Sequence, residues 1–190
     1  QRHGRPVKRW AYRDSAARVC FYHDRYEPKG ERKQFSPLTL WRSSGGKLWW
    51  QFKAPPVPRP IMNGDQLAQR PAAPVLIVEG EKAADAAALL WPAAVVVCWQ
   101  GGAQAVERAD WRPLAGRDVV LWPDADEPGA ACMEKLARVL QGVGVDRLRC
   151  LDLAQLAQGP GCSSGGSPTL APGNPLAEGD DAADLVGAYL

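Results

Sequence analysis

Several features that mark other classes of protein are missing from this sequence of 190 residues. It has no run of about 18 apolar residues, so we expect no membrane-spanning helix. The first residues are polar and form no apolar signal segment, which favours a cytoplasmic location. The pattern G-x-x-x-x-G-K-[ST] does not occur either, and this excludes a nucleotide-binding P-loop within the chain.

Cysteine and histidine are too sparse to suggest a zinc or disulfide framework. The sequence has five cysteines, two histidines and no C-x-x-C pair, so we do not expect a zinc ribbon. Because the number of cysteines is odd, a disulfide framework is also disfavoured, and we expect most cysteines to be small apolar fillers. The chain begins with Gln1 rather than Met, and we expect it to be part of a longer protein.

The net charge of +2 conceals two parts of opposite sign. Residues 1–70 carry 15 Lys and Arg against 5 Asp and Glu, whereas residues 71–190 carry 8 against 16. A basic segment suits the phosphates of nucleic acid, and an acidic segment suits metal ions. The sequence therefore predicts two parts that bind different partners.

The basic part is also rich in aromatic residues. Ten of the 15 aromatic side chains fall in the first 70 residues, where residues 9–12, 18–23 and 47–52 are typical of short strands. These rings either stack on bases or form the core of a small sheet, and both interpretations are open. The rings concerned are Trp10, Tyr12, Phe21, Trp49 and Trp50. As phosphate contacts we predict Arg9, Arg13, Arg32 and Lys33.

From residue 74 onward the pattern alternates between buried strands and helices. Apolar runs predict strands at residues 75–78, 94–98, 118–122 and 145–151. Helical propensity and spacing predict helices at residues 81–91, 103–109 and 130–140, with a turn at Pro128-Gly129. This alternation is typical of a parallel sheet with right-handed crossovers and helices on its faces.

Three of the predicted strands end in turns with polar or glycine residues. Glu79 follows the first strand, Gly101 and Gly102 follow the second, and Asp124 and Asp126 follow the third. Because the carboxyl ends of parallel strands open on one edge, we expect these turns to share a crevice. Mg²⁺ (or Mn²⁺) prefers carboxylate oxygens together with water and substrate phosphates, so we predict a metal site at the three carboxylates. The glycine pair either lets the backbone approach a phosphate closely or is only a tight turn.

Other charged residues of this part have simpler interpretations. We interpret Glu81 and Asp85 as solvent-facing charges of the helix that follows Glu79. Lys82 is either a nucleic-acid contact or an ordinary surface lysine. We expect Asp180, Asp181 and Asp184 in the acidic first turn of a C-terminal helix.

Taken together, the motifs resemble a TOPRIM domain, in particular that of primases and primase-helicases of phages and other mobile elements. The segments that carry the resemblance are V-L-I-V-E-G-E-K-A-A-D-A-A (75–87), W-Q-G-G-A (99–103) and V-V-L-W-P-D-A-D-E-P-G (119–129). The resemblance implies a Rossmann-like α/β fold, with a four-stranded parallel sheet flanked by helices and preceded by a small basic β-rich region. It also implies that Glu79, Asp124 and Asp126 are the catalytic, Mg²⁺-handling residues.

The family resemblance divides the chain and implies a function. The parts are the basic region (1–60), a linker with a short helix (61–73), the TOPRIM domain (74–152), and a Gly/Ser/Pro-rich loop with a C-terminal helix (153–190). The implied enzyme is a nucleotidyltransferase of DNA replication that makes RNA primers on single-stranded DNA from nucleoside triphosphates, with a helicase domain or subunit as partner. Two alternatives stay open: a TOPRIM nuclease that uses the same metal chemistry, and a non-catalytic DNA-binding TOPRIM module.

Overall fold

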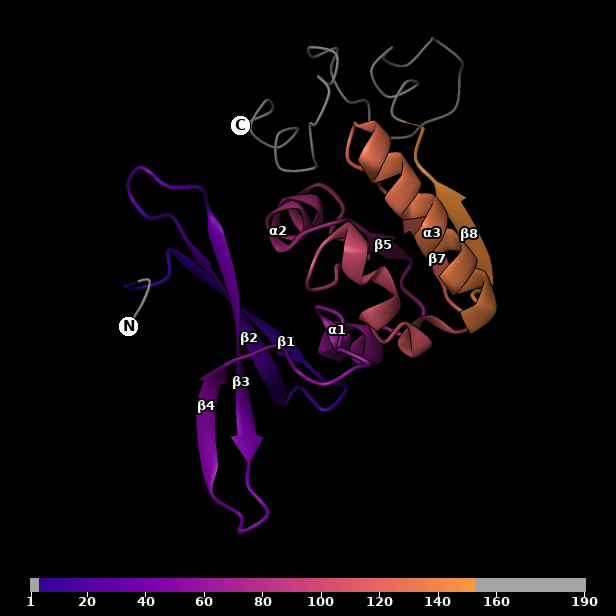
Figure 1. The fold of residues 1–190 in the computed structure, drawn as a ribbon. Helices are drawn as coiled ribbons and strands as arrows, with labels where there is room; N and C mark the ends of the chain where they lie inside the picture. Colours follow the sequence, from indigo (N-terminus) through magenta and orange to yellow (C-terminus); the bar gives the residue numbers. More distant parts are fainter. Residues whose placement is uncertain (1–3, 153–190) are drawn as a thin grey trace, which may run out of the picture.

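The computed structural model describes residues 4–152 and contains two four-stranded sheets that contribute to one shared hydrophobic cluster (Figure 1). The first sheet is antiparallel and the second is parallel. The predictions for residues 153–190, including Asp180, Asp181 and Asp184, lie outside the described residues. None of the helices in the described part has the length and apolar character needed to cross a bilayer.

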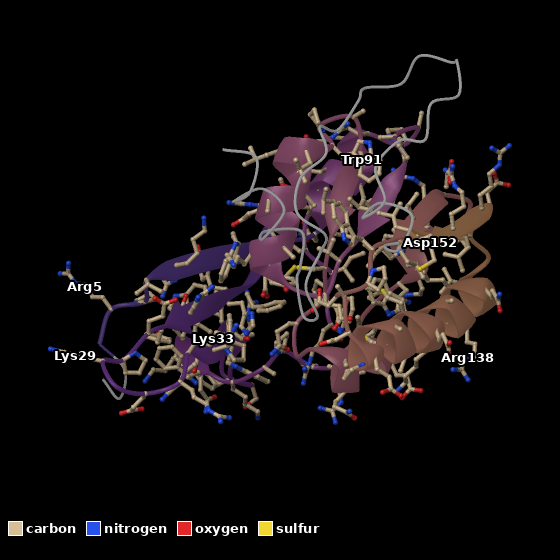
Figure 2. The ribbon with its side chains drawn as sticks, turned by 90° about the horizontal axis from the view of Figure 1, so that it is seen from above. Arg5, Lys29, Lys33, Trp91, Arg138 and Asp152 are labelled. Atoms are coloured by element: carbon tan, nitrogen blue, oxygen red, sulfur yellow. The ribbon has the colours of Figure 1, made fainter. Side chains whose placement is uncertain are left out.

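The antiparallel sheet has the order β1-β2-β3-β4. Its strands are β1 (Lys8–Arg13), β2 (Val19–Tyr26), β3 (Gln34–Arg42) and β4 (Leu48–Phe52). The sequence patterns indicated three of these strands and missed β3. Basic side chains such as Arg5, Lys29 and Lys33 lie on this side of the molecule, opposite the helix that carries Arg138 (Figure 2).

The parallel sheet has the order β6-β5-β7-β8 and confirms the predicted α/β architecture. Its strands are β5 (Val75–Ile77), β6 (Val95–Val97), β7 (Asp118–Leu121) and β8 (Arg147–Cys150). The connecting helices are α1 (Gly64–Gln69), α2 (Glu81–Leu90) and α3 (Glu127–Val143), with 3₁₀ turns η1 (Ala103–Arg108) and η2 (Arg112–Leu114). The short helix expected at 103–109 is therefore a 3₁₀ helix.

The start of α3 corrects a second detail. We predicted a turn at Pro128-Gly129 and a helix from residue 130, whereas the helix begins at Glu127 with Pro128 in its first turn. Proline is well tolerated there, because the first N–H groups of a helix have no partner within the helix and the ring presets the required φ. Glu127 is accordingly an exposed residue of the helix and not of a loop.

Side chains alternate between the two faces of the parallel sheet and build a core on each. On one face Ile77, Val97 and Leu121 pack with Leu136 and Leu140 of α3. On the other face Leu76, Val78 and Val96 pack with α2 and with aromatic residues of the antiparallel sheet. The two sheets consequently share one hydrophobic cluster. Trp10, Tyr12 and Phe21 belong to this cluster and are 6%, 0% and 0% exposed, so for these rings the core interpretation is correct.

Glu81, at the start of α2, joins the two sheets through buried hydrogen bonds. Its Oε1 atom accepts a hydrogen bond from the Tyr12 hydroxyl at 2.6 Å and lies 2.5 Å from His23 Nδ1. Glu81 is only 6% exposed, so our interpretation of it as a solvent-facing charge is wrong. The reason is that the antiparallel sheet covers this side of α2, which the local helical pattern does not reveal.

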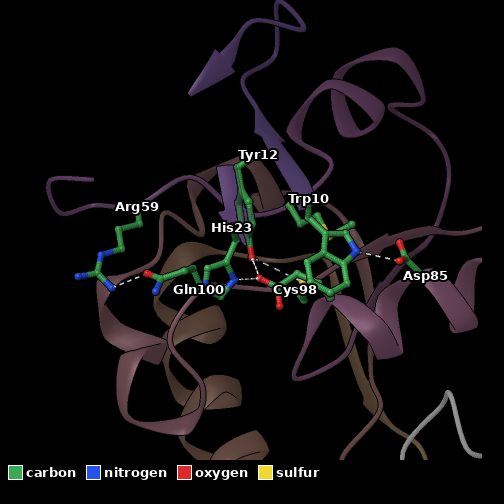
Figure 3. Close-up of polar contacts among 9 residues, drawn as sticks. Trp10, Tyr12, His23, Arg59, Asp85, Cys98 and Gln100 are labelled. Atoms are coloured by element: carbon green, nitrogen blue, oxygen red, sulfur yellow. Dashed lines mark hydrogen bonds and ion pairs between the residues drawn. The ribbon is translucent and has the colours of Figure 1, made fainter. Parts of the chain in front are cut away.

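Asp85, one turn further along α2, makes the second polar contact of this junction. Its Oδ2 atom accepts a hydrogen bond from Trp10 Nε1 at 2.8 Å (Figure 3). The same atom lies 3.3 Å from Lys8 Nζ. The carboxylate is 41% exposed, so Asp85 faces solvent only in part. Both acidic residues of α2 therefore hold the antiparallel sheet in place.

The charge of Glu81 is stabilised where it lies. Burial alone would raise the pKa of Glu81, but the hydrogen bond and charge of His23, together with the Tyr12 hydroxyl, lower it below its usual value. Removing this carboxylate would leave buried polar atoms of Tyr12 and His23 without their partner, which is more costly than losing an exposed ion pair.

Replacing Glu81 with alanine should therefore lower the free energy of unfolding by about 3 kcal/mol. Urea denaturation measures the change. The matched control is Glu134→Ala on α3, whose exposed carboxylate lies 3.9 Å from Arg138 and should contribute less than about 0.5 kcal/mol. Equal effects of the two substitutions would contradict the assigned role of Glu81.

Candidate metal and phosphate site

The parallel sheet brings the predicted turns to one edge. Strand β5 lies between β6 and β7, with Ile77 opposite both Val97 and Leu121. The hydrogen bonds continue past the strands, since Trp122 N donates to Ile77 O at 2.9 Å and Val78 N to Val97 O at 3.1 Å. Glu79 therefore emerges between the glycine turn after β6 and the acidic turn after β7.

Glu79 has a strongly perturbed carboxyl group at this edge. It is half-buried, and its Oε1 atom is shielded from solvent without a hydrogen-bond partner among the described residues. Burial, followed by the charges of Asp124 and Asp126, raises the pKa of Glu79 to about 7, against the lowering effect of the Cys132 thiol and the Asp124 N–H. A carboxyl group with this pKa can gain or lose a proton near neutral pH.

Cys132, on α3, supports Glu79. Burial and the nearby charges of Glu79 and Asp124 raise the pKa of Cys132 to about 12, so its thiol stays protonated, and its interaction with the carboxylate lowers the pKa of Glu79. From the sequence, we expected this cysteine, like most of the others, to be a small apolar filler. No local pattern links it to Glu79, which is 53 residues away in the chain.

Asp126 has two tasks, because it is also the N-cap of α3. Its Oδ1 accepts a hydrogen bond from Gly129 N at 2.7 Å, which satisfies a free N–H of the first helical turn. A Cβ atom at Gly129 would lie 2.7 Å from Asp124 O and 2.9 Å from Asp126 Oδ1. The spacing D-x-D-x-x-G is thus a steric requirement, since only glycine lets the helix start this close to both aspartates.

The glycine turn after β6 is equally restricted. Gly101 has φ +107° and Gly102 has φ +64°, a region that L side chains rarely adopt, and a Cβ at Gly101 would lie 2.8 Å from the Ala105 Cβ. Gly102 O accepts a hydrogen bond from Trp99 Nε1 at 2.8 Å. The glycine pair is therefore required by the turn itself, and its contact with phosphate stays a prediction.

The three carboxylates fit a Mg²⁺ ion that is held partly by the substrate. Their donor atoms are oxygens. Burial first, and then the charges of Asp124 and Asp126, raise the pKa of Glu79, and a cation would offset the repulsion between these carboxylates. No group of three or more His, Cys, Asp or Glu side chains within residues 4–152 is placed so that it could hold a metal ion. One or two of these carboxylates would therefore bind Mg²⁺, and water and substrate phosphates would complete its coordination.

The predicted nucleic-acid contacts are dispersed over the described structure. Arg9 forms a bidentate ion pair with the buried Asp24 at 2.6 and 2.7 Å, and Arg13 donates to Ala17 O in its own turn at 2.9 Å. Lys82 is exposed on α2. Arg32 and Lys33 are exposed between β2 and β3.

Strand β4 carries aromatic rings that remain available to a partner. Trp49 and Trp50 are 40% and 48% exposed, unlike the buried rings of β1 and β2. Lys53 Nζ lies 4.6 Å from the centre of the Trp41 ring, and Tyr22 packs on Trp50 with ring centres 5.5 Å apart. The two groups of rings could not be distinguished from the sequence, because the burial of each ring depends on which strands face α2.

Comparisons with known proteins identify the fold. No family model matches the sequence, and no curated protein does. An Aquifex aeolicus primase, solved with its zinc-binding and RNA polymerase domains, has a TM-score of 0.57 and 15% identity over 94% of this chain and 36% of that one. A DNA primase domain from Pseudomonas aeruginosa has a TM-score of 0.53 and 17% identity over 95% and 46%. The catalytic domain of the primase DnaG, solved with single-stranded DNA, has a TM-score of 0.53 and 17% identity over 94% and 46%.

The chain thus has the fold of part of a primase catalytic domain. It spans less than half of the length of these solved structures. At such low identity the likeness shows the fold alone.

The raised pKa of Glu79 predicts a pH-dependent stability. A carboxyl group whose pKa is higher in the folded state contributes stability below its unfolded value, and this contribution is lost as the pH rises towards 7. In metal-free buffer Glu79→Gln should therefore become more stable than the wild type between about pH 5 and pH 8, with little difference at pH 4. Denaturant unfolding with EDTA measures this, and parallel pH curves would contradict it. Adding Mg²⁺ at pH 8 should stabilise the wild type more than the variant.

The steric role of Gly129 predicts the outcome of a pair of substitutions in α3. Gly129→Ala forces the helix start away from Asp124 and Asp126, and should lower the free energy of unfolding by about 1–3 kcal/mol. Gly142→Ala is the control, because a Cβ there meets nothing within 4 Å and alanine favours the helix by roughly 0.5–1 kcal/mol. Thermal or urea unfolding measures both. A Gly129→Ala variant as stable as the wild type would refute this reading of the motif.

Proposed function

We propose that this chain is the core of a Mg²⁺-dependent nucleotidyltransferase that makes RNA primers on single-stranded DNA. The observation that carries the proposal is the position of Glu79 beside Asp124 and Asp126 at the carboxyl edge of a sheet. The primase catalytic fold of the chain supports primer synthesis over other reactions of the same carboxylates. The motifs resemble those of primases from phages and mobile elements, which supports a role in DNA replication.

In this proposal each carboxylate has a distinct task. Asp124 and Asp126 would hold Mg²⁺, and the capping bond from Gly129 N fixes the direction of Asp126. The bound ion would orient the phosphates of the incoming nucleotide and offset the negative charge that develops during transfer. Glu79 is suited to hold or accept a proton at this edge, because its pKa lies near 7.

The antiparallel sheet would hold the nucleic acid. One of the primases of this fold was solved with single-stranded DNA, which supports such a partner here. Arg32, Lys33 and Lys82 are exposed and can contact phosphates, whereas Trp49 and Trp50 can stack on bases. This division would give binding that weakens steeply with salt.

Primer synthesis tests the proposal directly. The protein is incubated with single-stranded DNA, four ribonucleoside triphosphates and Mg²⁺ or Mn²⁺, and the products are separated on a denaturing gel. New oligoribonucleotides are expected with the wild type, and a loss of about 100-fold or more with Asp124→Asn/Asp126→Asn.

The control is Asp118→Asn at the opposite end of β7, where the carboxylate pairs with Arg149 at 2.8 Å. It should keep activity within about twofold, because an exposed ion pair contributes little. Shortened DNA in place of new RNA would indicate a nuclease. If the wild type and the double variant bind DNA alike and neither yields a product, the chain is a non-catalytic module.

A further inference from the structure

Two arginines flank the glycine turn and take no part in the carboxylate site. Arg59 lies in the proline-rich segment before α1, and Arg108 is the last residue of η1. Arg59 N donates to Arg108 O, and Asp110 N donates to Arg59 O, both at 2.7 Å. These two hydrogen bonds fix the backbone of Arg59 against the end of η1.

The side chain of Arg59 is fixed as well. Its Nη1 donates to Gln100 Oε1 at 2.7 Å (Figure 3), and Gln100 directly precedes the glycine pair. The same Nη1 lies 3.6 Å from the position that a Cβ on Gly101 would occupy. The guanidinium group therefore lies on the glycine turn, at the sheet edge where Glu79 also emerges.

The charge of this arginine pair is uncompensated within residues 4–152. Neither arginine forms an ion pair there, and the nearest acidic residues in sequence are already used: Glu107 pairs with Lys135, and Asp110 with Arg112. Arg59 Nε is shielded from solvent and donates no hydrogen bond to a described residue. Burial and the charge of Arg108 both lower the pKa of Arg59, as expected of two cations without a counter-ion.

We propose that Arg59, with Arg108 beside it, binds a phosphate group of the substrate at the glycine turn. A guanidinium group suits this task because its planar set of N–H donors matches phosphate oxygens. Two strand spacings, about 10 Å, separate β6 from β7, so the arginines and the aspartates would hold different parts of one substrate. This phosphate would belong either to a nucleic-acid strand or to a nucleoside triphosphate, and both candidates rest on the proposed function.

Two binding measurements test this inference without catalysis. The first uses a fluorescent dT oligonucleotide in EDTA at several salt concentrations, and the second uses ATP with Mg²⁺ in a calorimeter. Arg59→Met should lower the affinity for one of the two probes by roughly 10-fold, and Arg59→Lys should lower the same affinity less. If the phosphate belongs to the oligonucleotide, the salt slope should fall by about 0.7 for the lost contact. If only the affinity for ATP falls, the phosphate belongs to the nucleotide.

Two further variants separate binding from folding. Arg108→Gln removes the second charge without removing a side-chain hydrogen bond found in the described structure. It should lower the affinity for the same probe as Arg59→Met does, but by a smaller factor. Arg138→Gln, on the exposed face of α3, should bind like the wild type. The inference is overturned if Arg59→Met and Arg108→Gln bind both probes as tightly as the wild type does. It is also overturned if Arg138→Gln loses as much affinity as these two variants, or if the wild type binds neither probe.

This inference and the proposed function can fail separately. Loss of binding by Arg59→Met, in a protein that makes no RNA, would refute primer synthesis and retain the phosphate site. Primer synthesis that needs Asp124 and Asp126, together with unchanged binding by Arg59→Met, would retain the function and refute the phosphate site.

Discussion

The central position of β5 in the parallel sheet is the constraint on which the site depends. Because β5 is hydrogen-bonded to β6 on one side and β7 on the other, the residue that follows it must emerge between their two turns. That residue is Glu79, and its burial at this edge, together with the charges of Asp124 and Asp126, raises the pKa of its carboxyl group to about 7. Two residues later the chain enters α2, where Glu81 is bound by Tyr12 and His23 of the other sheet. The segment E-G-E thus places one glutamate in the site and uses the other to attach the antiparallel sheet.

The roles of these two glutamates also show how far sequence reasoning reaches. The strand exits could be predicted, because buried parallel strands are continuous apolar runs and the chain direction fixes which ends meet. The burial of Glu81 could not, since its partners lie 58 and 69 residues away on a sheet whose packing is set by tertiary contacts. Strand β3 was missed because it contains Pro37, which lacks an N–H and normally argues against an inner strand. The contact of Arg59 with Gln100 could not be predicted either, because the two residues are far apart in the sequence. The prolines around Arg59 indicate only a linker.

The aromatic side chains of the basic region form two groups, one buried and one exposed. Trp10, Tyr12 and Phe21 lie in the core shared with the parallel sheet, so part of the aromatic surplus serves folding. Trp49 and Trp50 remain exposed on β4 and keep the capacity to stack on bases. Composition alone could not divide them, because tryptophan occurs in both groups and both have basic neighbours in the sequence.

In the proposed function, Asp124 and Asp126 would hold a divalent cation at the sheet edge where Glu79 emerges. Crystals of the protein soaked in Mn²⁺ and measured at the manganese absorption edge test it most directly, because anomalous scattering locates the ion without reference to activity. We expect an anomalous peak in direct contact with a carboxylate oxygen of Asp124 or Asp126, and its loss in crystals of Asp124→Asn/Asp126→Asn. A peak elsewhere on the molecule, with none at this edge, would show that these carboxylates do not bind the ion.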